Sequence, residues 1–286
     1  MGQLPPHELW PLKEAASGRR REWWIAHDDA SQDAGTSALL ARWVAMRQSG
    51  WPIAYLTGTR EFYGRSFWVS RDTLIPRIET ELLVDTAIAA LKKVRSRVPA
   101  PRLCDLGTGS GCIGISLALE CADLQVTASD ASGGALRMAR NNAAWLGAAA
   151  RMVFQESSWW DGITGRFHGI VSNPPYIAAG DSHLTAGDLR FEPALALSPG
   201  AMKSDAPGRL GRDHGTAPGP ASGLSAIAEI VAGAPAHLEP SGFCAIEHGH
   251  DQQAPVMALF QSAGFGRITG LRDGFGNPRV VLGWLQ

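Results

Sequence analysis

Two short segments of the 286-residue chain combine residue types that could do chemistry together, and the first is Asn173-Pro174-Pro175-Tyr176. Its two prolines stiffen the backbone and remove two N–H donors. The side-chain oxygen of Asn173 and the carbonyl of Pro174 are then available to accept hydrogen bonds from a bound group. A planar NH2 group conjugated to a carbonyl or a ring supplies two such donors. The segment therefore predicts a binding site for a carboxamide or an aromatic amine.

The nitrogen of such a group is a poor nucleophile because its lone pair is delocalised. Asn173 and Pro174 can hold its two hydrogens and aim the lone pair at a reaction partner, and their dipoles then stabilise the positive charge that develops on nitrogen. Tyr176 can pack on the planar group and add a cation–π interaction. Fixing the two reactants in line can lower a barrier by roughly 7–11 kcal/mol. We therefore expect catalytic roles for Asn173, Pro174 and Tyr176, with Pro175 completing the substrate-binding segment.

The second segment is a glycine turn between an apolar strand and a helix, RLCDLGTGSGCIGISLALE (102–120). Glycines in the turn permit positive φ angles and let a ligand approach the backbone closely. The N-terminus of the following helix offers free N–H groups. Asp130 lies at the end of the next strand, where a carboxylate can accept hydrogen bonds from both hydroxyls of a ribose.

This glycine turn alone leaves the cofactor open. Gly109, Gly111 and Gly114 match the G-x-G-x-x-G pattern of dinucleotide-binding proteins, and Asp130 lies near the spacing of their acidic residue. Asp105, however, directly precedes the turn in the order D-L-G-x-G-x-G, which resembles the first motif of class I methyltransferases. That resemblance implies S-adenosylmethionine as the cofactor, with its methionine part against the turn and its ribose on Asp130. The cofactor-binding residues that it implies are Gly107, Thr108, Gly109, Ser110, Gly111, Asp130, Trp159 and Asn173.

Strands and helices alternate in the region that must position both segments. Such alternation predicts a parallel α/β sheet with helices on both faces, and the carboxyl ends of its strands form the edge where ligands bind. The last 21 residues instead predict two antiparallel strands at the edge of the sheet. The expected strands are 102–106, 125–129, 167–172 and 242–247, and the expected helices are 112–120, 133–146 and 251–263.

The first 70 or so residues indicate a separate helical part. Apolar residues in 37–50 recur at helical spacing, with Ser37 as the expected N-cap. Residues 58–70 predict a β-hairpin that joins two domains, and a helix is expected to begin near Glu79. The segment 198–223 contains six glycines and four prolines among 26 residues and predicts a flexible surface insertion.

Composition and charge argue against membrane and nucleic-acid functions. Apolar residues make up 45% of the chain, but no uninterrupted apolar stretch is long enough to span a bilayer. Because the N-terminus also does not resemble a signal peptide, we expect a cytoplasmic protein without membrane contact. With a net charge of −1, the chain has no broad positive field that would attract the phosphates of a nucleic acid. Neither a metal site nor a disulfide is expected, because the four cysteines lie scattered through apolar segments.

Six stretches, which include the two segments above, occur in the order typical of one family. Together they resemble the PrmC/HemK family of peptide chain release factor N5-glutamine methyltransferases, over nearly the whole chain beyond about residue 36. The stretches are WPIAYLTGTREFYGRSFWVSRDTLIPRIETELLV (51–84), DLGTGSG (105–111), SNPPY (172–176), RFEPALAL (190–197), AIEHG (245–249) and LRDGFGNPRVVLG (271–283).

The resemblance implies an α/β fold: a Rossmann-like class I methyltransferase domain over 75–286, with a mostly parallel seven-stranded sheet and an antiparallel edge. A small helical domain that docks the substrate, with a hairpin linker, precedes it over 1–74. The implied substrate is the side-chain nitrogen of the glutamine in the Gly-Gly-Gln motif of class-1 peptide chain release factors. Separately from the resemblance, we expect the protein to be a monomer. Family signature positions with an orienting, packing or ligand role are Arg77, Phe191, Glu192, Glu247 and His248.

The sequence departs from the family pattern at a few positions. Ile78 replaces a usual proline, and Ser157-Ser158 stand where an acid and an aromatic residue near the adenine are common, so either Ser158 or Trp159 is the expected adenine contact. Other functions stay open beside the main one. They are an adenine-N6 methyltransferase acting on DNA or RNA, an N5-glutamine methyltransferase of a ribosomal protein, and a binding module that retains the fold without turnover.

Overall fold

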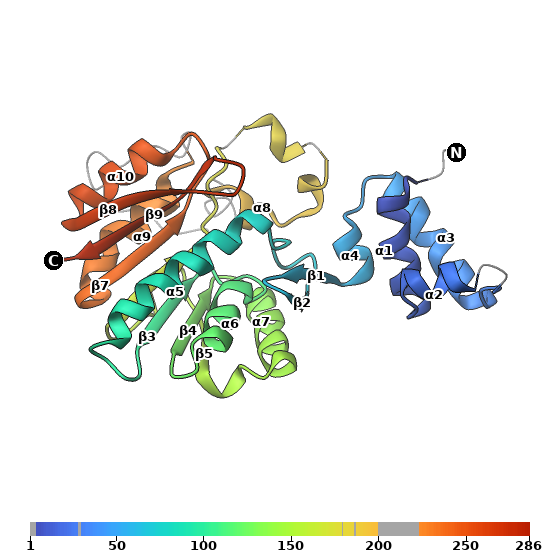
Figure 1. Ribbon diagram of the computed structural model, residues 1–286. Helices are drawn as coiled ribbons and strands as arrows, with labels where there is room; N and C mark the ends of the chain where they lie inside the picture. Colours follow the sequence, from blue (N-terminus) through green and yellow to red (C-terminus); the bar gives the residue numbers. More distant parts are fainter. Residues whose placement is uncertain (1–3, 28–29, 179, 186, 200–222) are drawn as a thin grey trace.

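The computed structural model describes residues 4–27, 30–178, 180–185, 187–199 and 223–286, so most of the expected insertion lies outside the described residues. A small group of helices lies to one side of a larger α/β body, and a two-stranded hairpin connects the two (Figure 1). The helical part comprises α1 (Pro6–Ser17), α2 (Arg21–Ala26), α3 (Ala34–Gln48) and α4 (Ile53–Thr57). The hairpin strands are β1 (Thr59–Phe62) and β2 (Arg65–Trp68), as expected.

Helix α3 begins earlier than expected, and its N-cap is Asp33 rather than Ser37. The Asp33 carboxylate accepts a hydrogen bond from the Thr36 backbone N–H at 2.9 Å and another from the Thr36 hydroxyl at 2.6 Å. A carboxylate satisfies the free N–H groups of a first turn and also interacts favourably with the helix dipole. The prediction of Ser37 as the cap was therefore wrong, because Asp33 precedes it with a stronger acceptor.

A seven-stranded sheet forms the centre of the α/β body, in the order β5-β4-β3-β6-β7-β9-β8. Strands β3 to β7 run parallel, and β9 runs antiparallel to both β7 and β8, which confirms the expected antiparallel edge. The strands are β3 (Arg102–Leu106), β4 (Gln125–Asp130), β5 (Met152–Glu156), β6 (Phe167–Ser172), β7 (Leu238–Glu247), β8 (Phe265–Arg272) and β9 (Pro278–Leu285).

The predicted helices of this body agree closely with the structure. The helix expected near Glu79 begins with the 3-10 turn η1 (Ile78–Thr80) and continues as α5 (Glu81–Arg95). Strand β5 and the helices α8 and α9 were not predicted. The other helices are α6 (Cys112–Glu120), α7 (Gly133–Leu146), α8 (Ala194–Leu197), α9 (Ser225–His237) and α10 (Gln253–Ser262), and the other 3-10 turns are η2 (Ala149–Arg151), η3 (Ser182–Thr185) and η4 (Leu189–Phe191).

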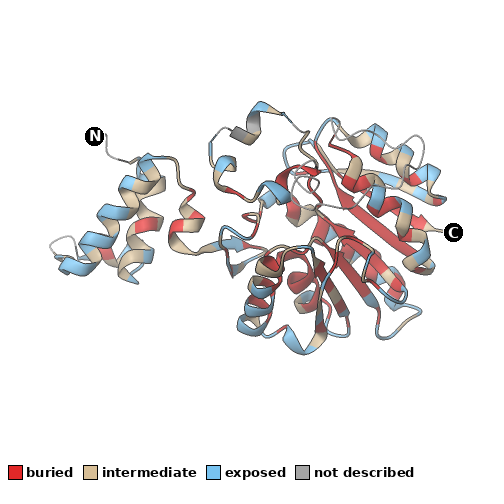
Figure 2. Cartoon of the chain, turned by 180° about the vertical axis from the view of Figure 1, so that it is seen from behind, coloured by how far each residue is buried: buried red, intermediate tan, exposed pale blue. Residues whose placement is uncertain are grey.

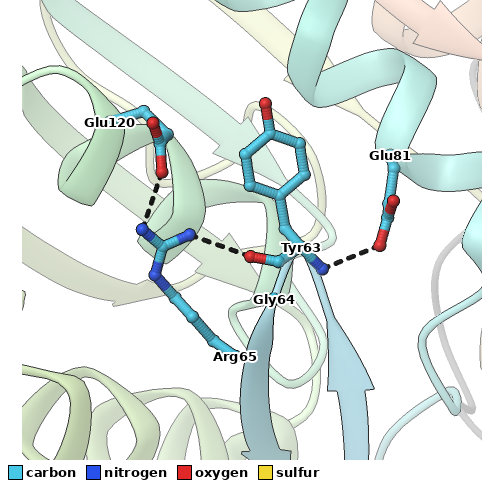
Figure 3. Close-up of a pocket in the computed structure, with 5 residues that line it drawn as sticks. All are labelled: Tyr63, Gly64, Arg65, Glu81 and Glu120. Carbon is cyan, nitrogen blue, oxygen red and sulfur yellow. Dashed lines mark hydrogen bonds and ion pairs between the residues drawn. The ribbon is translucent and has the colours of Figure 1, made fainter.

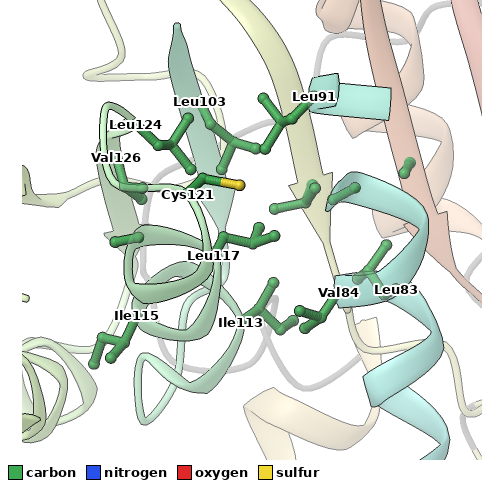
Figure 4. Close-up of a cluster of buried hydrophobic side chains, with 14 of the residues drawn as sticks. Leu83, Val84, Leu91, Leu103, Ile113, Ile115, Leu117, Cys121, Leu124 and Val126 are labelled. Carbon is green, nitrogen blue, oxygen red and sulfur yellow. The ribbon is translucent and has the colours of Figure 1, made fainter. Parts of the chain in front are cut away.

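Two hydrophobic clusters cover the two faces of the sheet. The first packs α5 and α6 against the strands through large buried side chains such as Leu83, Leu103 and Leu117 (Figure 4). The second packs α9 and α10 on the other face. Fully burying one such leucine stabilises a fold by about 1.5–3 kcal/mol. Figure 2 shows the strands as the most buried part, whereas the N-terminal helices are mostly intermediate or exposed.

The strand order brings the two chemical segments together. From β3 the chain moves outward through β4 and β5, and β6 then returns to the other side of β3. Because β3 and β6 are parallel neighbours, their carboxyl ends meet at this reversal, the position where open α/β sheets bind ligands. The Ser172 hydroxyl donates a hydrogen bond to the Leu106 carbonyl at 2.7 Å, just before both segments begin.

Within the ranges given above, no helix is long and apolar enough to cross a membrane. No cluster of three or more potential metal ligands occurs among those residues either. All four cysteines are buried free thiols.

Candidate active site

The glycine turn after β3 has the open geometry that a cofactor requires. Gly107, Gly109 and Gly111 have φ angles of 70°, 57° and 84°, in the left-handed region that favours glycine. A Cβ on Gly111 would lie 2.6 Å from Ile115 of α6, so packing of the protein itself excludes a side chain there. A Cβ on Gly109 would meet no atom within 4 Å. The surface at Gly109 is therefore free for a ligand.

Asp105, near the end of β3, fixes the conformation of this turn through hydrogen bonds. Its Oδ2 accepts hydrogen bonds from the Thr108 hydroxyl at 2.6 Å and from the Gly114 backbone N–H at 3.0 Å. The side chain is fully buried, and burial raises its pKa to about 6. Asp105 thus joins the turn to the first residues of α6, which is a structural role.

Asp130 lies beside the turn, at the end of β4. Its Oδ2 accepts a hydrogen bond from the Gly109 N–H and its Oδ1 accepts one from the Ser132 N–H, each at 2.9 Å. Burial raises the pKa of this carboxyl, and the two N–H groups oppose that rise. Each carboxylate oxygen has a second lone pair, so both can still accept a hydroxyl. The fixed carboxylate fits the expected role toward a ribose.

Trp159 lies against the same turn, in a loop after β5. Its ring carbon Cζ3 is 3.4 Å from the position of a Cβ on Gly107, and the indole is 7% exposed. The Ser157 hydroxyl donates to the Trp159 carbonyl at 2.9 Å and accepts from the Gly162 N–H at 3.1 Å. Ser157 therefore stabilises this loop internally, whereas Ser158 is partly exposed. Which of Ser158 and Trp159 contacts an adenine stays a prediction.

The Asn173–Tyr176 segment directly follows β6, and two buried side chains fix it. The Asn173 Nδ2 donates a hydrogen bond to the Thr80 hydroxyl oxygen at 3.1 Å, and the Tyr176 hydroxyl donates to Glu247 Oε1 at 3.3 Å. The Tyr176 carbonyl accepts a hydrogen bond from Gln252 Nε2 at 3.0 Å.

A cavity of about 240 Å³ opens beside this segment. Asn173, Pro174 and Tyr176 line it, whereas Pro175 is buried behind them. Its charged lining consists of Arg77, Glu79, Glu247 and Arg279.

Glu247 is the last residue of β7 and is 1% exposed. Burial raises its pKa to about 7, while hydrogen bonds from Thr80 and Tyr176 and the charge of Arg279 act in the opposite direction. The adjacent His248 is also buried, its Nδ1 lies 2.7 Å from the Gly249 carbonyl oxygen, and it does not line the cavity. Of these two family-signature residues, the acid faces the site and the histidine supports the backbone.

Glu192 joins two walls of the cavity. Its Oε2 accepts the Ile75 backbone N–H at 3.1 Å, and its Oε1 forms an ion pair with Arg77. The neighbouring Phe191 packs on Trp51, between α3 and α4, with ring centroids 5.0 Å apart. Arg77, Phe191 and Glu192 thus connect the helical part to the cavity.

A second hollow of about 430 Å³ lies at the hairpin turn (Figure 3). The Tyr63 N–H donates to Glu81 at 2.7 Å, and Arg65 forms an ion pair with Glu120 at 2.6 Å. The charged side chains of this hollow already have partners: Arg65 pairs with Glu120, and Glu81 accepts the Tyr63 N–H. Because no expected site residue lines it either, this hollow is not part of the candidate active site.

Comparisons with known proteins agree with this geometry. Residues 80–197 match the family model described as "Methyltransferase small domain". A protein of Bordetella pertussis named "Release factor glutamine methyltransferase" is 42% identical over 99% of this chain and 96% of its own. The chain belongs to the release factor glutamine methyltransferase family. Family members of Yersinia pestis and Xylella fastidiosa (strain Temecula1) are 36% and 41% identical over 98% and 92% of this chain, and over 92% and 87% of their own.

A methyltransferase of Pyrococcus furiosus shares the fold of this family member. Its crystal structure superposes with a TM-score of 0.51 at 15% identity, over 85% of this chain and 98% of its own. The expected Rossmann-like methyltransferase fold is thereby confirmed, and membership of the family confirms an S-adenosylmethionine-dependent methyltransferase. The open surface at Gly109 and the fixed carboxylate of Asp130 fit that cofactor.

Sequence reasoning assigned no role to Thr80 and Arg279, although both lie within the family stretches. Thr80 is 2% exposed and contacts Asn173, which lies 93 residues further along the chain. No local pattern indicates such a contact. A sequence signal that could have indicated these neighbours was Glu247, a carboxyl at the end of an apolar strand. In the structure Glu247 accepts a hydrogen bond from Tyr176 of the site.

Proposed function

We propose that this chain transfers a methyl group from S-adenosylmethionine to the side-chain amide nitrogen of the glutamine in the Gly-Gly-Gln motif of class-1 peptide chain release factors. The observation that carries the proposal is the cavity at the carboxyl end of β6, which presents Asn173 and Pro174 beside the glycine turn. The name shared by its relatives supports the same substrate.

The cofactor supplies a methyl group on a positively charged sulfur. Asn173 Oδ1 and the Pro174 carbonyl accept the two amide hydrogens of the glutamine, which turns the nitrogen lone pair toward that methyl group. Their dipoles stabilise the positive charge on the nitrogen as the new C–N bond forms. The methylated nitrogen then releases one proton, for which no strong base is needed.

Orientation supplies the largest part of the rate increase, within a range of roughly 7–11 kcal/mol for well-placed reactants. Tyr176 packs on the amide plane, and its ring is held by the Glu247 carboxylate. The residues proposed to hold the cofactor are Gly107, Thr108, Gly109, Ser110, Gly111, Asp130 and Trp159.

The helical part over residues 1–74 is proposed to dock the release factor. Its α3 contacts the segment that carries the cavity-lining Leu189, because Arg47 forms an ion pair at 2.8 Å with Asp188, the residue before η4. The protein is proposed to act as a monomer in the cytoplasm, where release factors work, without binding nucleic acid directly.

The test is incubation with labelled S-adenosylmethionine and one of four substrates: a release factor, its Gln→Ala variant, ribosomal proteins, or duplex DNA. Label on the release factor, and none on the Gln→Ala variant, is the expected result. Equal label on the variant, or label only on ribosomal protein or DNA, would reject the proposed substrate.

A further inference from the structure

Three exposed apolar side chains lie around the cavity beside Asn173. Ile78 begins η1 and is 61% exposed, Leu195 of α8 is 46% exposed, and Phe275, in the turn between β8 and β9, is 78% exposed. Single exposed apolar residues are normal on a protein surface. These three, however, come from three separate elements and flank one cavity, and grouped exposed apolar side chains are typical of an interaction site.

The first two residues are direct neighbours of the cavity lining. Ile78 lies between the lining residues Arg77 and Glu79, and Leu195 directly precedes the lining residue Ala196. The start of α5, helix α8 and the turn between β8 and β9 all lie at the same end of the sheet (Figure 1). The apolar side chains therefore surround the opening of the cavity.

Phe275 is fixed to the cavity wall through Asp273. One carboxylate oxygen of Asp273 accepts the backbone N–H groups of Phe275 and Asn277, both at 2.9 Å. The other oxygen accepts Nε of Arg279 at 3.2 Å, and Arg279 lines the cavity. The Asp273 side chain is 3% exposed, so these contacts are shielded from water. The turn thus presents an exposed ring at a fixed place beside the cavity.

We propose that Ile78, Leu195 and Phe275 form an apolar rim that binds the release-factor loop on both sides of the reacting glutamine. This inference rests on the proposed function. A glutamine side chain is short, so its main chain and the adjacent residues have to lie at the opening when its amide lies beside Asn173.

The protein substrate therefore covers the rim in every productive complex. Covering apolar surface removes it from water and favours binding roughly in proportion to the area covered. The two glycines before the glutamine carry no side chains, so their main chain can approach the rim closely. The rim adds affinity for the loop and takes no part in the methyl transfer itself.

The first test measures KM and kcat for a full-length release factor in Phe275→Ser and Ile78→Ser. Each variant is expected to raise KM about tenfold, the order found when an apolar anchor is lost from an interface. The kcat is expected to stay within about threefold, because binding alone is weakened. Both side chains are exposed, so the unfolding temperature is expected to equal that of wild type.

Val153→Ser is the matched control. Val153 is 63% exposed and lies on β5, at the opposite edge of the sheet from β8. Its KM is expected to equal that of wild type. A wild-type KM in both rim variants, or an equal rise of KM in the control, would overturn the inference.

A readout without turnover separates this inference from the proposed function. The four native cysteines are buried, so a bimane label attaches selectively to Phe275→Cys. Addition of the Gln→Ala release factor is expected to shift the label's emission to shorter wavelength, whereas the same label on Val153→Cys is expected to stay unchanged.

The outcomes differ for the two proposals. A wild-type enzyme that fails to methylate a release factor would reject the proposed function. Normal methylation without any shift of the label would reject the rim alone. A shift that depends on enzyme concentration in the absence of release factor would show that the rim pairs with a second copy of the chain, which would also overturn the inference.

Discussion

The carboxylate of Asp130 accepts a hydrogen bond at 2.9 Å from the backbone N–H of Gly109, which joins the end of β4 to the turn after β3. The open face of Gly109 and the second lone pairs of Asp130 thus belong to one rigid surface. If that surface holds the cofactor, changes on either side of this hydrogen bond have to weaken cofactor binding, whereas matched changes elsewhere in the fold leave it unchanged.

A methyl group on Gly109 provides the first check. Gly109 and Gly147 both have positive φ, 57° and 79°, and a Cβ on either meets no atom within 4 Å. Alanine at either position is therefore expected to cost a similar folding free energy, about 1–2 kcal/mol. Gly109→Ala is expected to raise the Kd of S-adenosylmethionine at least about tenfold, or ~1.4 kcal/mol, and Gly147→Ala to leave it unchanged. Calorimetric titration measures the Kd, and equal values for the two variants would contradict the assignment of the turn.

Removal of the Asp130 carboxylate gives the second prediction. Asp130→Ala is expected to weaken cofactor binding by about 1.5–3 kcal/mol, the range for a hydrogen bond to a charged group. Asp33→Ala is the matched control, because Asp33 also accepts a backbone N–H at the start of a helix. The control is expected to lose about 1 kcal/mol of stability with no change in cofactor Kd. Fluorescence-detected unfolding and calorimetry together separate the two effects.

Asn173→Ala tests the acceptor directed at the substrate. Loss of one acceptor that stabilises developing charge is expected to lower kcat by about 10²–10³-fold. The Kd of S-adenosylmethionine is expected to change less than about threefold, because Asn173 is proposed to act mainly on the glutamine amide. Single-turnover methylation of a release factor measures the first quantity and calorimetry the second. Near-normal turnover would refute the mechanism.

The ion pairs of Arg47 test the docking role of the helical part. Arg47 joins Glu8 of α1 at 2.6 Å to Asp188 beside the cavity at 2.8 Å, and its side chain is 18% exposed. Arg47→Met is expected to loosen the helical part and raise the KM for a full-length release factor roughly tenfold, or ~1.4 kcal/mol, with kcat nearly unchanged.

Arg95→Met serves as the control for that variant, because it removes an exposed ion pair with Asp123 at the C-terminal end of α5, and neither residue lines the cavity. Its KM is expected to equal that of wild type. The same KM in Arg47→Met would show that docking does not depend on this contact.

Local sequence signals predicted most of the sheet's central part. The apolar residues on the two sides of the glycine turn predicted β3 and α6 with their observed bounds. These predictions succeeded because each pattern lies within the few residues that form the element. Strand β5 was missed because it is an edge strand in which Met152 is the only buried residue and Val153 is exposed, so its apolar pattern is weak. Helix α9 was missed because it is rich in small residues, contains Pro235 and follows a Gly/Pro-rich segment.

The sequence by itself determined which residues would follow each strand: a glycine turn after β3, an acid at the end of β4, and Asn173 with its prolines after β6. Only the tertiary structure decided which of them meet. The contact of Thr80 with Asn173, and of Tyr176 with Glu247, requires β6 to lie between β3 and β7. Strand order depends on the packing of the whole sheet, and no window of neighbouring residues contains that information.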